Sequence, residues 1–158
     1  MTDLILIIAK RLREQYGAKE IILYGSYAKG EETADSDIDI LVISDTKERF
    51  CERQATVKRL LRGLKSKVAV SPIVLTPAEL DGRLKMNDVF IKEIMDTGKI
   101  ITADMIEEME KWLLSQGATP VTEEMKKEPW YAEVSNLPSF MTLDKKQLMD
   151  RHKDMAKR

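Results

Sequence analysis

Two short segments of this 158-residue chain combine residue types that can bind a phosphorylated ligand. Gly25 and Ser26 interrupt one apolar run, and Asp37 and Asp39 open another, with ten residues between Ser26 and Asp37. Residues two apart on a strand project from the same face, so the two carboxylates are expected side by side. The spacing therefore predicts a pair of acids close to a Gly-Ser turn.

A carboxylate pair at Asp37 and Asp39 needs a cation, because like charges held close together repel and raise the pKa of one of them. Ligands that are all oxygen favour Mg²⁺, with Mn²⁺ as the second candidate, over zinc. The single histidine, His152, lies in a polar C-terminal segment, and the single cysteine, Cys51, has no histidine near it. We expect neither a histidine base nor a zinc site.

The Gly25-Ser26 turn is the predicted phosphate-binding half of the site. Backbone N–H groups and the Ser26 hydroxyl can face an anion there, and a helix that began at the turn would add its dipole. Lys29 fits a phosphate contact, and Ser36, next to the acids, belongs to the same predicted set. A phosphate-binding turn beside paired carboxylates predicts a metal-bound nucleoside triphosphate as the ligand.

Hydrophobic periodicity predicts the elements that must position these residues. Gly17 and the Thr76-Pro77 pair provide a helix stop and a helix start, and the polar residues 27–36 are typical of a loop. The predicted elements are a helix over 4–16, a strand over 20–24, a strand over 37–43, a helix over 50–64, a strand over 67–75, a helix from 76, a helix over 89–97 and a strand over 99–102. Because strict βαβ alternation is missing, we expect an α/β or α+β fold with helices packed on a mixed β-sheet.

The character of the chain changes near residue 103, which predicts two domains. Residues 1–103 contain every element named above, and residues 104–158 form a helical and irregular C-terminal extension. The extension begins with a predicted helix over 104–116. Its later aromatic residues, Trp130, Tyr131 and Phe140, are interpreted as packing residues.

The composition excludes several classes of function. Lys and Arg number 26 against 27 Asp and Glu, so no global basic field favours nucleic acid as a partner. The apolar run Leu4–Ile8 is too short to span a membrane and lacks the basic start of a signal peptide. A lone cysteine fits the reducing cytoplasm, where we expect the protein to reside. Self-association is left open.

The two segments resemble the signature of the polymerase-β-like nucleotidyltransferases, in which Gly-Ser is followed after ten residues by Asp-x-Asp. They are most similar to the minimal nucleotidyltransferases, a type that includes antitoxins paired with a HEPN toxin. Lys29 stands where that family often has arginine, and Ile91–Ile101 resembles its closing helix and strand. The resemblance covers residues 4–102 and implies a palm-like fold in which Asp37 and Asp39 hold the metal and ATP is the first candidate nucleotide.

One part of the family pattern is missing. The family usually carries a third carboxylate on the neighbouring strand, where it completes the site of the metal ion that activates the attacking hydroxyl. Here the positions that could face the aspartates are Ala69 and Ser71, and neither is acidic. Pro72 also removes a ladder donor, which indicates an edge strand or a bulge. The resemblance then implies that triphosphate binding is kept and nucleophile activation is weakened.

Three functions remain open from the sequence. The first is a Mg²⁺-dependent enzyme that moves a nucleoside monophosphate, AMP from ATP, to a hydroxyl of a protein or small molecule, with the aspartates as metal ligands. The second is a slow or non-catalytic antitoxin-like module that neutralises a HEPN-type toxin by binding it. The third is an antibiotic-modifying type of transferase, which the short chain disfavours because such enzymes usually add a large substrate domain.

Overall fold

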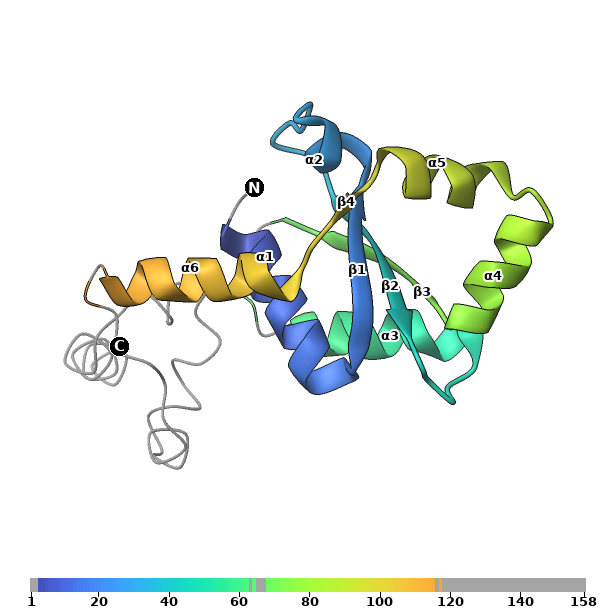
Figure 1. The fold of residues 1–158 in the computed structure, drawn as a ribbon, viewed down its shortest axis with the longest axis horizontal. Coiled ribbons are helices and arrows are strands. Elements are labelled where there is room, and N and C mark those ends of the chain that lie inside the picture. The colour runs from blue at the N-terminus through green and yellow to red at the C-terminus, as the bar shows by residue number, and fades with distance from the viewer. Residues whose placement is uncertain (1–2, 63, 65–67, 116, 118–158) are drawn as a thin grey trace. The chain divides into compact units, whose positions relative to one another are not determined.

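The computed structural model describes residues 3–62, 64, 68–115 and 117 (Figure 1). The chain divides into two compact units, Met1–Arg62 with Ser66–Ile106 and Gly63–Lys65 with Glu107–Arg158. The first unit carries the β-sheet and every residue of the predicted site. The predicted domain edge at residues 103 and 104 stays a prediction. The interpretation of Trp130, Tyr131 and Phe140 as packing residues lies outside the described residues.

The centre of the first unit is a mixed four-stranded sheet with the strand order β3-β2-β1-β4. β1 runs antiparallel to β2 and β4, whereas β2 and β3 are parallel. The strands are β1 (Ala18–Tyr24), β2 (Ile38–Ser44), β3 (Val70–Leu75) and β4 (Lys99–Ile100). The mixed sheet with packed helices confirms the predicted fold class. Pro72 lies in the edge strand β3, as its missing N–H donor indicated.

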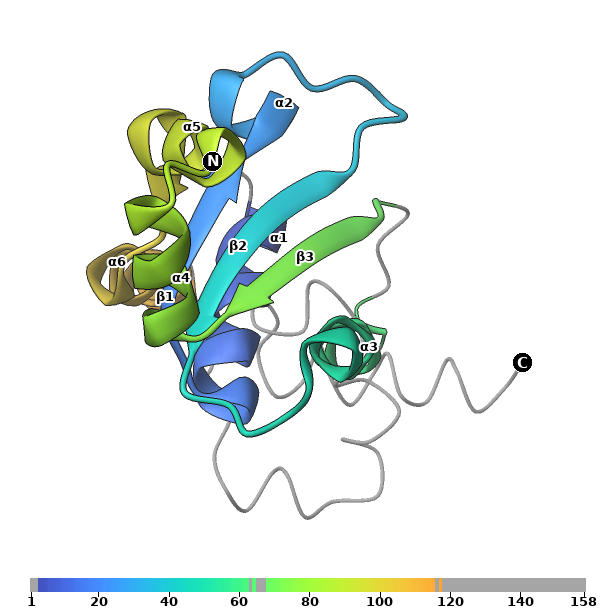
Figure 2. The same cartoon turned by 90° about the vertical axis from the view of Figure 1, so that its right-hand side faces the viewer.

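Helices lie on both faces of this sheet (Figure 2). The helices are α1 (Asp3–Arg11) with its π-helical continuation η1 (Leu12–Tyr16), α2 (Gly25–Lys29), α3 (Phe50–Leu61), α4 (Pro77–Lys85), α5 (Val89–Thr97) and α6 (Ala103–Ser115). α4 and α5 cover one face, while α1 and α3 lie on the other (Figure 2). Among the described residues, no helix is long and apolar enough to cross a membrane.

Side-chain alternation sorts each strand between these two faces. Tyr24 and Asp39 are opposite each other in the β1–β2 register, and Asp39 is opposite Ser71 in the β2–β3 register. Tyr24 packs against the buried cluster that α5 forms with the sheet, so all three residues belong to the face covered by α4 and α5. Ile38 and Ile40, which flank Asp39, are buried on the other face.

Two helix ends form for the reasons that the sequence predicted, and a third has a cap that was not predicted. Gly17 ends the first helix in the left-handed conformation, with φ of 73°. Thr76 caps α4, where its hydroxyl accepts from the Glu79 N–H at 3.2 Å and the Glu79 carboxylate accepts from the Thr76 N–H at 2.9 Å. Asp88 caps α5, because its carboxylate accepts from the Phe90 and Ile91 N–H groups.

The prediction of a loop over residues 27–36 was wrong for residues 27–29. These residues belong to α2, which begins at Gly25 directly after β1. Ala28 is buried and anchors this short helix to the sheet, and Gly30 ends it with φ of 71°. A single buried alanine gives no periodic signal, which explains why the helix was not predicted from the polar composition.

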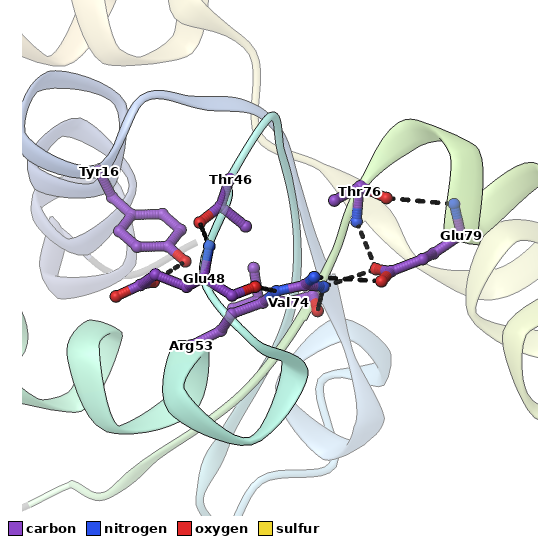
Figure 3. Close-up of polar contacts among 7 residues, drawn as sticks. All are labelled: Tyr16, Thr46, Glu48, Arg53, Val74, Thr76 and Glu79. Carbon is purple, nitrogen blue, oxygen red and sulfur yellow. Dashed lines mark hydrogen bonds and ion pairs between the residues drawn. The ribbon is translucent and has the colours of Figure 1, made fainter.

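A buried arginine links several elements at the end of the sheet where the parallel strands β2 and β3 finish (Figure 3). The Arg53 guanidinium donates to the Glu48 carbonyl at 3.0 Å and to the Val74 carbonyl at 3.3 Å. It also forms a two-fold ion pair with Glu79, at 2.5 and 3.1 Å. Tyr16 donates to the Glu48 carboxylate at 2.9 Å, so η1, α3, β3 and α4 are linked by one network.

Candidate functional site

The two aspartates lie at the start of β2, on the face covered by α4 and α5. Asp39 is the second residue of the strand and half-buried, whereas Asp37 precedes the strand and is exposed. Ser71 of β3 connects them, because it is the register partner of Asp39 and its hydroxyl donates to the Asp37 carboxylate at 3.3 Å. The predicted side-by-side pair is therefore present.

The two carboxylates raise the cost of ionisation in their own neighbourhood. Burial raises the pKa of Asp39, and the nearby charge of Asp37 raises it further. Burial and the Asp39 carboxylate also raise the pKa of Tyr24 to about 12. Within the described part of the chain, no lysine or arginine forms an ion pair with either aspartate. A bound cation would relieve this repulsion.

Gly25 brings the predicted phosphate-binding turn close to Asp39. Its φ is 70°, a conformation that favours glycine. A β-carbon at this position would also collide with the carboxylate of Asp39. The Asp39 carboxylate thus lies directly over the first residue of α2. The two halves of the predicted site share one space, and any side chain at position 25 would fill it.

For the other predicted phosphate-binding residues, the structure gives their positions and exposure. Ser26 is half-buried at the second position of α2, and Lys29 is exposed at its end. The Ser36 hydroxyl accepts from the Thr33 N–H at 2.8 Å, so it contacts its own loop. The phosphate-binding roles of these residues stay predictions.

The neighbouring strand brings no third acid to the pair. Ser71 faces the aspartates as predicted, whereas Ala69 is exposed and contributes its carbonyl, which accepts from the Ile38 N–H at 2.8 Å. Among the described residues, no group of three or more His, Cys, Asp or Glu could hold a metal ion. The available ligands are two carboxylates and one hydroxyl, an all-oxygen set that fits Mg²⁺ or Mn²⁺.

Sequence reasoning missed two aromatic residues at this site. Tyr24 stands next to Asp39, and its ring meets that of Phe90 edge to face, with 5.8 Å between the ring centroids. Phe90 belongs to the first turn of α5, whose buried stripe consists of Ile91 and Ile94. The sequence did contain a signal for Phe90, the apolar run Val89-Phe90-Ile91. The buried face of α5 accounts only for Ile91, so the apolar character of the other two residues needs another explanation.

Comparison with known proteins agrees with this geometry. Residues 5–115 match the family model described as nucleotidyltransferase domain. The chain is 58% identical over 33 residues to the protein adenylyltransferase MntA of Thermococcus cleftensis, which covers 21% of this chain and 33% of that protein. It is 56% identical over 36 residues to a Methanocaldococcus jannaschii protein named as a putative protein adenylyltransferase, covering 23% of this chain and 36% of the relative.

A longer match extends the comparison. A second Methanocaldococcus jannaschii protein, also named as a putative protein adenylyltransferase, is 37% identical over 83 residues, which is 52% of this chain and 77% of that protein. In the two relatives with shorter matches, the aligned segment spans only about a third of their length. No solved structure matches the chain. The chain therefore belongs to the nucleotidyltransferase domain family, in the minimal nucleotidyltransferase type that its Gly-Ser and Asp-x-Asp motifs predicted.

Proposed function

We propose that the chain is a Mg²⁺-dependent adenylyltransferase, which moves AMP from ATP to a hydroxyl group of a protein or small molecule. One observation carries this proposal. The Asp39 carboxylate lies against Gly25, beside Asp37, so a cation bound by the two acids would be next to the turn that binds phosphate. The names of the relatives, a protein adenylyltransferase and a putative protein adenylyltransferase, support the choice of AMP as the transferred group.

In this proposal each residue has a separate task. Asp37 and Asp39 hold Mg²⁺, which supplies charge neutralisation of the phosphates when it is bound. The backbone at Gly25 and the Ser26 hydroxyl bind phosphate oxygens, and Lys29 and Ser36 complete that set. The acceptor hydroxyl attacks the α-phosphorus, the bond to pyrophosphate breaks, and the hydroxyl proton leaves to solvent or to a base on the acceptor.

The acceptor carries more of the reaction here than in a site with three acids. Ser71 occupies the position that faces Asp39, and its hydroxyl is neutral where a carboxylate would bring charge. Activation of the attacking hydroxyl is therefore weak, and the expected transfer is slow unless the acceptor supplies its own acidic or well-placed group.

The missing third acid favours a second candidate function. Without an acid at Ala69 or Ser71, the domain could bind nucleotide and a protein partner without turnover. The partner in this reading is a HEPN-type toxin, which the domain neutralises by binding. The two candidates make different demands on Asp37 and Asp39, because only the enzyme needs both carboxylates.

Thermal unfolding with each nucleoside triphosphate, with and without Mg²⁺, tests the proposal first. A ligand that binds the folded state raises the melting temperature by mass action. We expect ATP with Mg²⁺ to raise it in the wild type and in the control Asp35→Asn, an exposed loop acid, but not in Asp39→Asn. A shift of equal size in Asp39→Asn would overturn the assigned metal site.

Transfer itself is tested with ATP labelled at the α-phosphate, added to lysate and to candidate acceptors. Label that appears on an acceptor with wild-type protein and not with Asp39→Asn supports the enzyme. Nucleotide binding without transfer, together with capture of a partner that Asp39→Asn captures equally well, supports the binding module instead.

A further inference from the structure

An apolar turn borders the site on the side of α5. Met86, Val89 and Phe90 lie within five residues, and they are 81%, 78% and 49% exposed. Single exposed apolar residues are common on protein surfaces, but a cluster next to a ligand site indicates binding. In both views α5 lies at the same end of the sheet as α2, where β1 finishes (Figures 1 and 2).

Polar contacts hold this turn in place and keep its apolar side chains in water. Asp88 accepts from two backbone N–H groups of α5 and from Arg83 at 3.1 Å. Asn87, with φ of 56°, accepts from Lys92 at 2.8 Å. The Phe90 ring is also fixed from below by its edge-to-face contact with Tyr24. About half of the ring nevertheless stays exposed, which is unfavourable unless a ligand covers it.

The position of Phe90 relative to the aspartates fits one part of a nucleotide. Tyr24 is close to both, 5.8 Å from Phe90 by ring centroids and directly opposite Asp39 on the next strand. Opposite residues have β-carbons about 5 Å apart, so Phe90 lies on the order of 10 Å from the acids. A ribose can bridge that span between phosphates held at the acids and a base on the ring.

We infer that Phe90 is the surface on which the base of the bound nucleotide stacks, and that the base is a purine. This inference rests on the proposed function, because it assumes phosphates held at Asp37, Asp39 and Gly25. Every base has a flat face that an aromatic ring can cover, and the larger purines cover more of it. Val89 and Met86 add apolar surface beside the ring.

The test compares two ligands that share the phosphates and differ in the base. The full chain is titrated by calorimetry with ATP and with inorganic tripolyphosphate, both with Mg²⁺. Phe90→Leu keeps an apolar side chain against Tyr24 and removes the flat face. We expect it to weaken ATP binding about tenfold, in the range that the loss of one stacked base causes, with tripolyphosphate binding unchanged within about twofold.

Two controls make the result specific. Trp112→Leu removes another exposed aromatic residue, 55%, which belongs to α6, and should leave the affinity for both ligands unchanged. Phe90→Trp should restore or strengthen ATP binding. ATP and GTP should bind the wild type more tightly than CTP and UTP, and Phe90→Leu should remove most of that difference. Melting temperatures of all variants check that they are folded.

The outcomes separate the inference from the function on which it rests. Equal affinities of wild type and Phe90→Leu for ATP overturn the inference, and so does an equal loss for ATP and tripolyphosphate. If the wild type binds neither ligand with Mg²⁺, the proposed function fails and the inference fails with it. Binding of both ligands that Asp39→Asn abolishes, with no effect at position 90, would keep the function and assign the apolar turn to the acceptor.

Discussion

The two ends of the parallel β2–β3 pair differ in whether their charged side chains are paired with opposite charges. Where the strands finish, the Arg53 guanidinium is buried and each of its nitrogens is hydrogen-bonded, and Glu79 neutralises it. Where the strands begin, Asp37 and Asp39 stand together with a single serine hydroxyl between them. The first arrangement is complete without a ligand and stabilises the fold. The second holds two like charges that no described lysine or arginine pairs with, which agrees with the proposed cation site.

Removal of the arginine should have the largest effect on stability. Arg53→Ala removes the ion pair with Glu79 and the hydrogen bonds to the Glu48 and Val74 carbonyls, so we expect it to lower the free energy of unfolding by about 3 kcal/mol. Urea unfolding of Arg53→Ala against Arg59→Ala, an exposed arginine of the same helix, measures this. Equal midpoints for the two variants would show that the network contributes little.

At the end of the strands that carries the aspartates, a substitution should reduce activity without lowering stability. Asp39→Asn removes the repulsion from Asp37, so we expect a stability equal to or above that of the wild type. Transfer of AMP should nevertheless fall on the order of 100-fold or more, because a metal ligand is lost. The paired measurement is urea unfolding and labelled transfer on the same preparation. A clear loss of stability in Asp39→Asn would remove the distinction between the two ends.

The stability that the Arg53–Glu79 pair contributes should depend on pH. The bond from Arg53, more than any other cause, lowers the pKa of Glu79 to about 2 from its ordinary 4.5. A lowered pKa in the folded state stabilises the protein above pH 4.5, and that stability is lost as the pH falls from 4.5 toward 2. Since Glu79 is partly exposed, we expect a loss of about 1 to 2 kcal/mol.

Urea midpoints between pH 7 and pH 2.5 measure that loss. In Glu79→Gln the titrating group is gone, so its curve should start lower at pH 7 and fall less steeply below pH 4.5. Parallel curves for the two proteins would mean that other carboxylates cause the acid dependence.

The smallest expected effect on stability comes from adding the missing acid. Ser71→Asp places a third carboxylate against Asp37 and Asp39, so without metal it should destabilise the protein by about 0.5 to 1 kcal/mol. Added Mg²⁺ or Mn²⁺ should reverse this loss and raise the melting temperature more than in the wild type. Ser71→Asn is the matched control of nearly equal size and no charge. If Mg²⁺ or Mn²⁺ raised the melting temperatures of Ser71→Asp and Ser71→Asn equally, position 71 would not belong to the metal site.

The sequence predicted the acid pair and the sheet around it well, because both depend on local periodicity. Residues two apart on a strand share a face, so Asp37 and Asp39 could be placed together without any tertiary information. Ser71 could be aligned with them once β3 was assumed to run beside β2. The helix α2 was not predicted, because one buried residue, Ala28, positions it.

Other parts of the site depend on contacts between distant segments, which periodicity does not carry. Phe90 is 66 residues from Tyr24, and only packing of α5 on the sheet brings their rings together. The Arg53–Glu79 pair likewise joins α3 to α4. The contact of Asp39 with Gly25 needed the β1–β2 register, which fixes the residue opposite each strand position.

The position of Asp39 between two buried isoleucines has a consequence for how the chain folds. Ile38 and Ile40 are almost fully buried on the face turned away from α4 and α5. If β2 paired one residue out of register, every side chain would change face, and the Asp39 charge would enter the core while isoleucines faced the site. Burying an unpaired carboxylate costs several kcal/mol, so misaligned pairings are penalised during folding. Asp39, which is proposed to hold the metal, therefore also favours the correct register of β2 in the sheet.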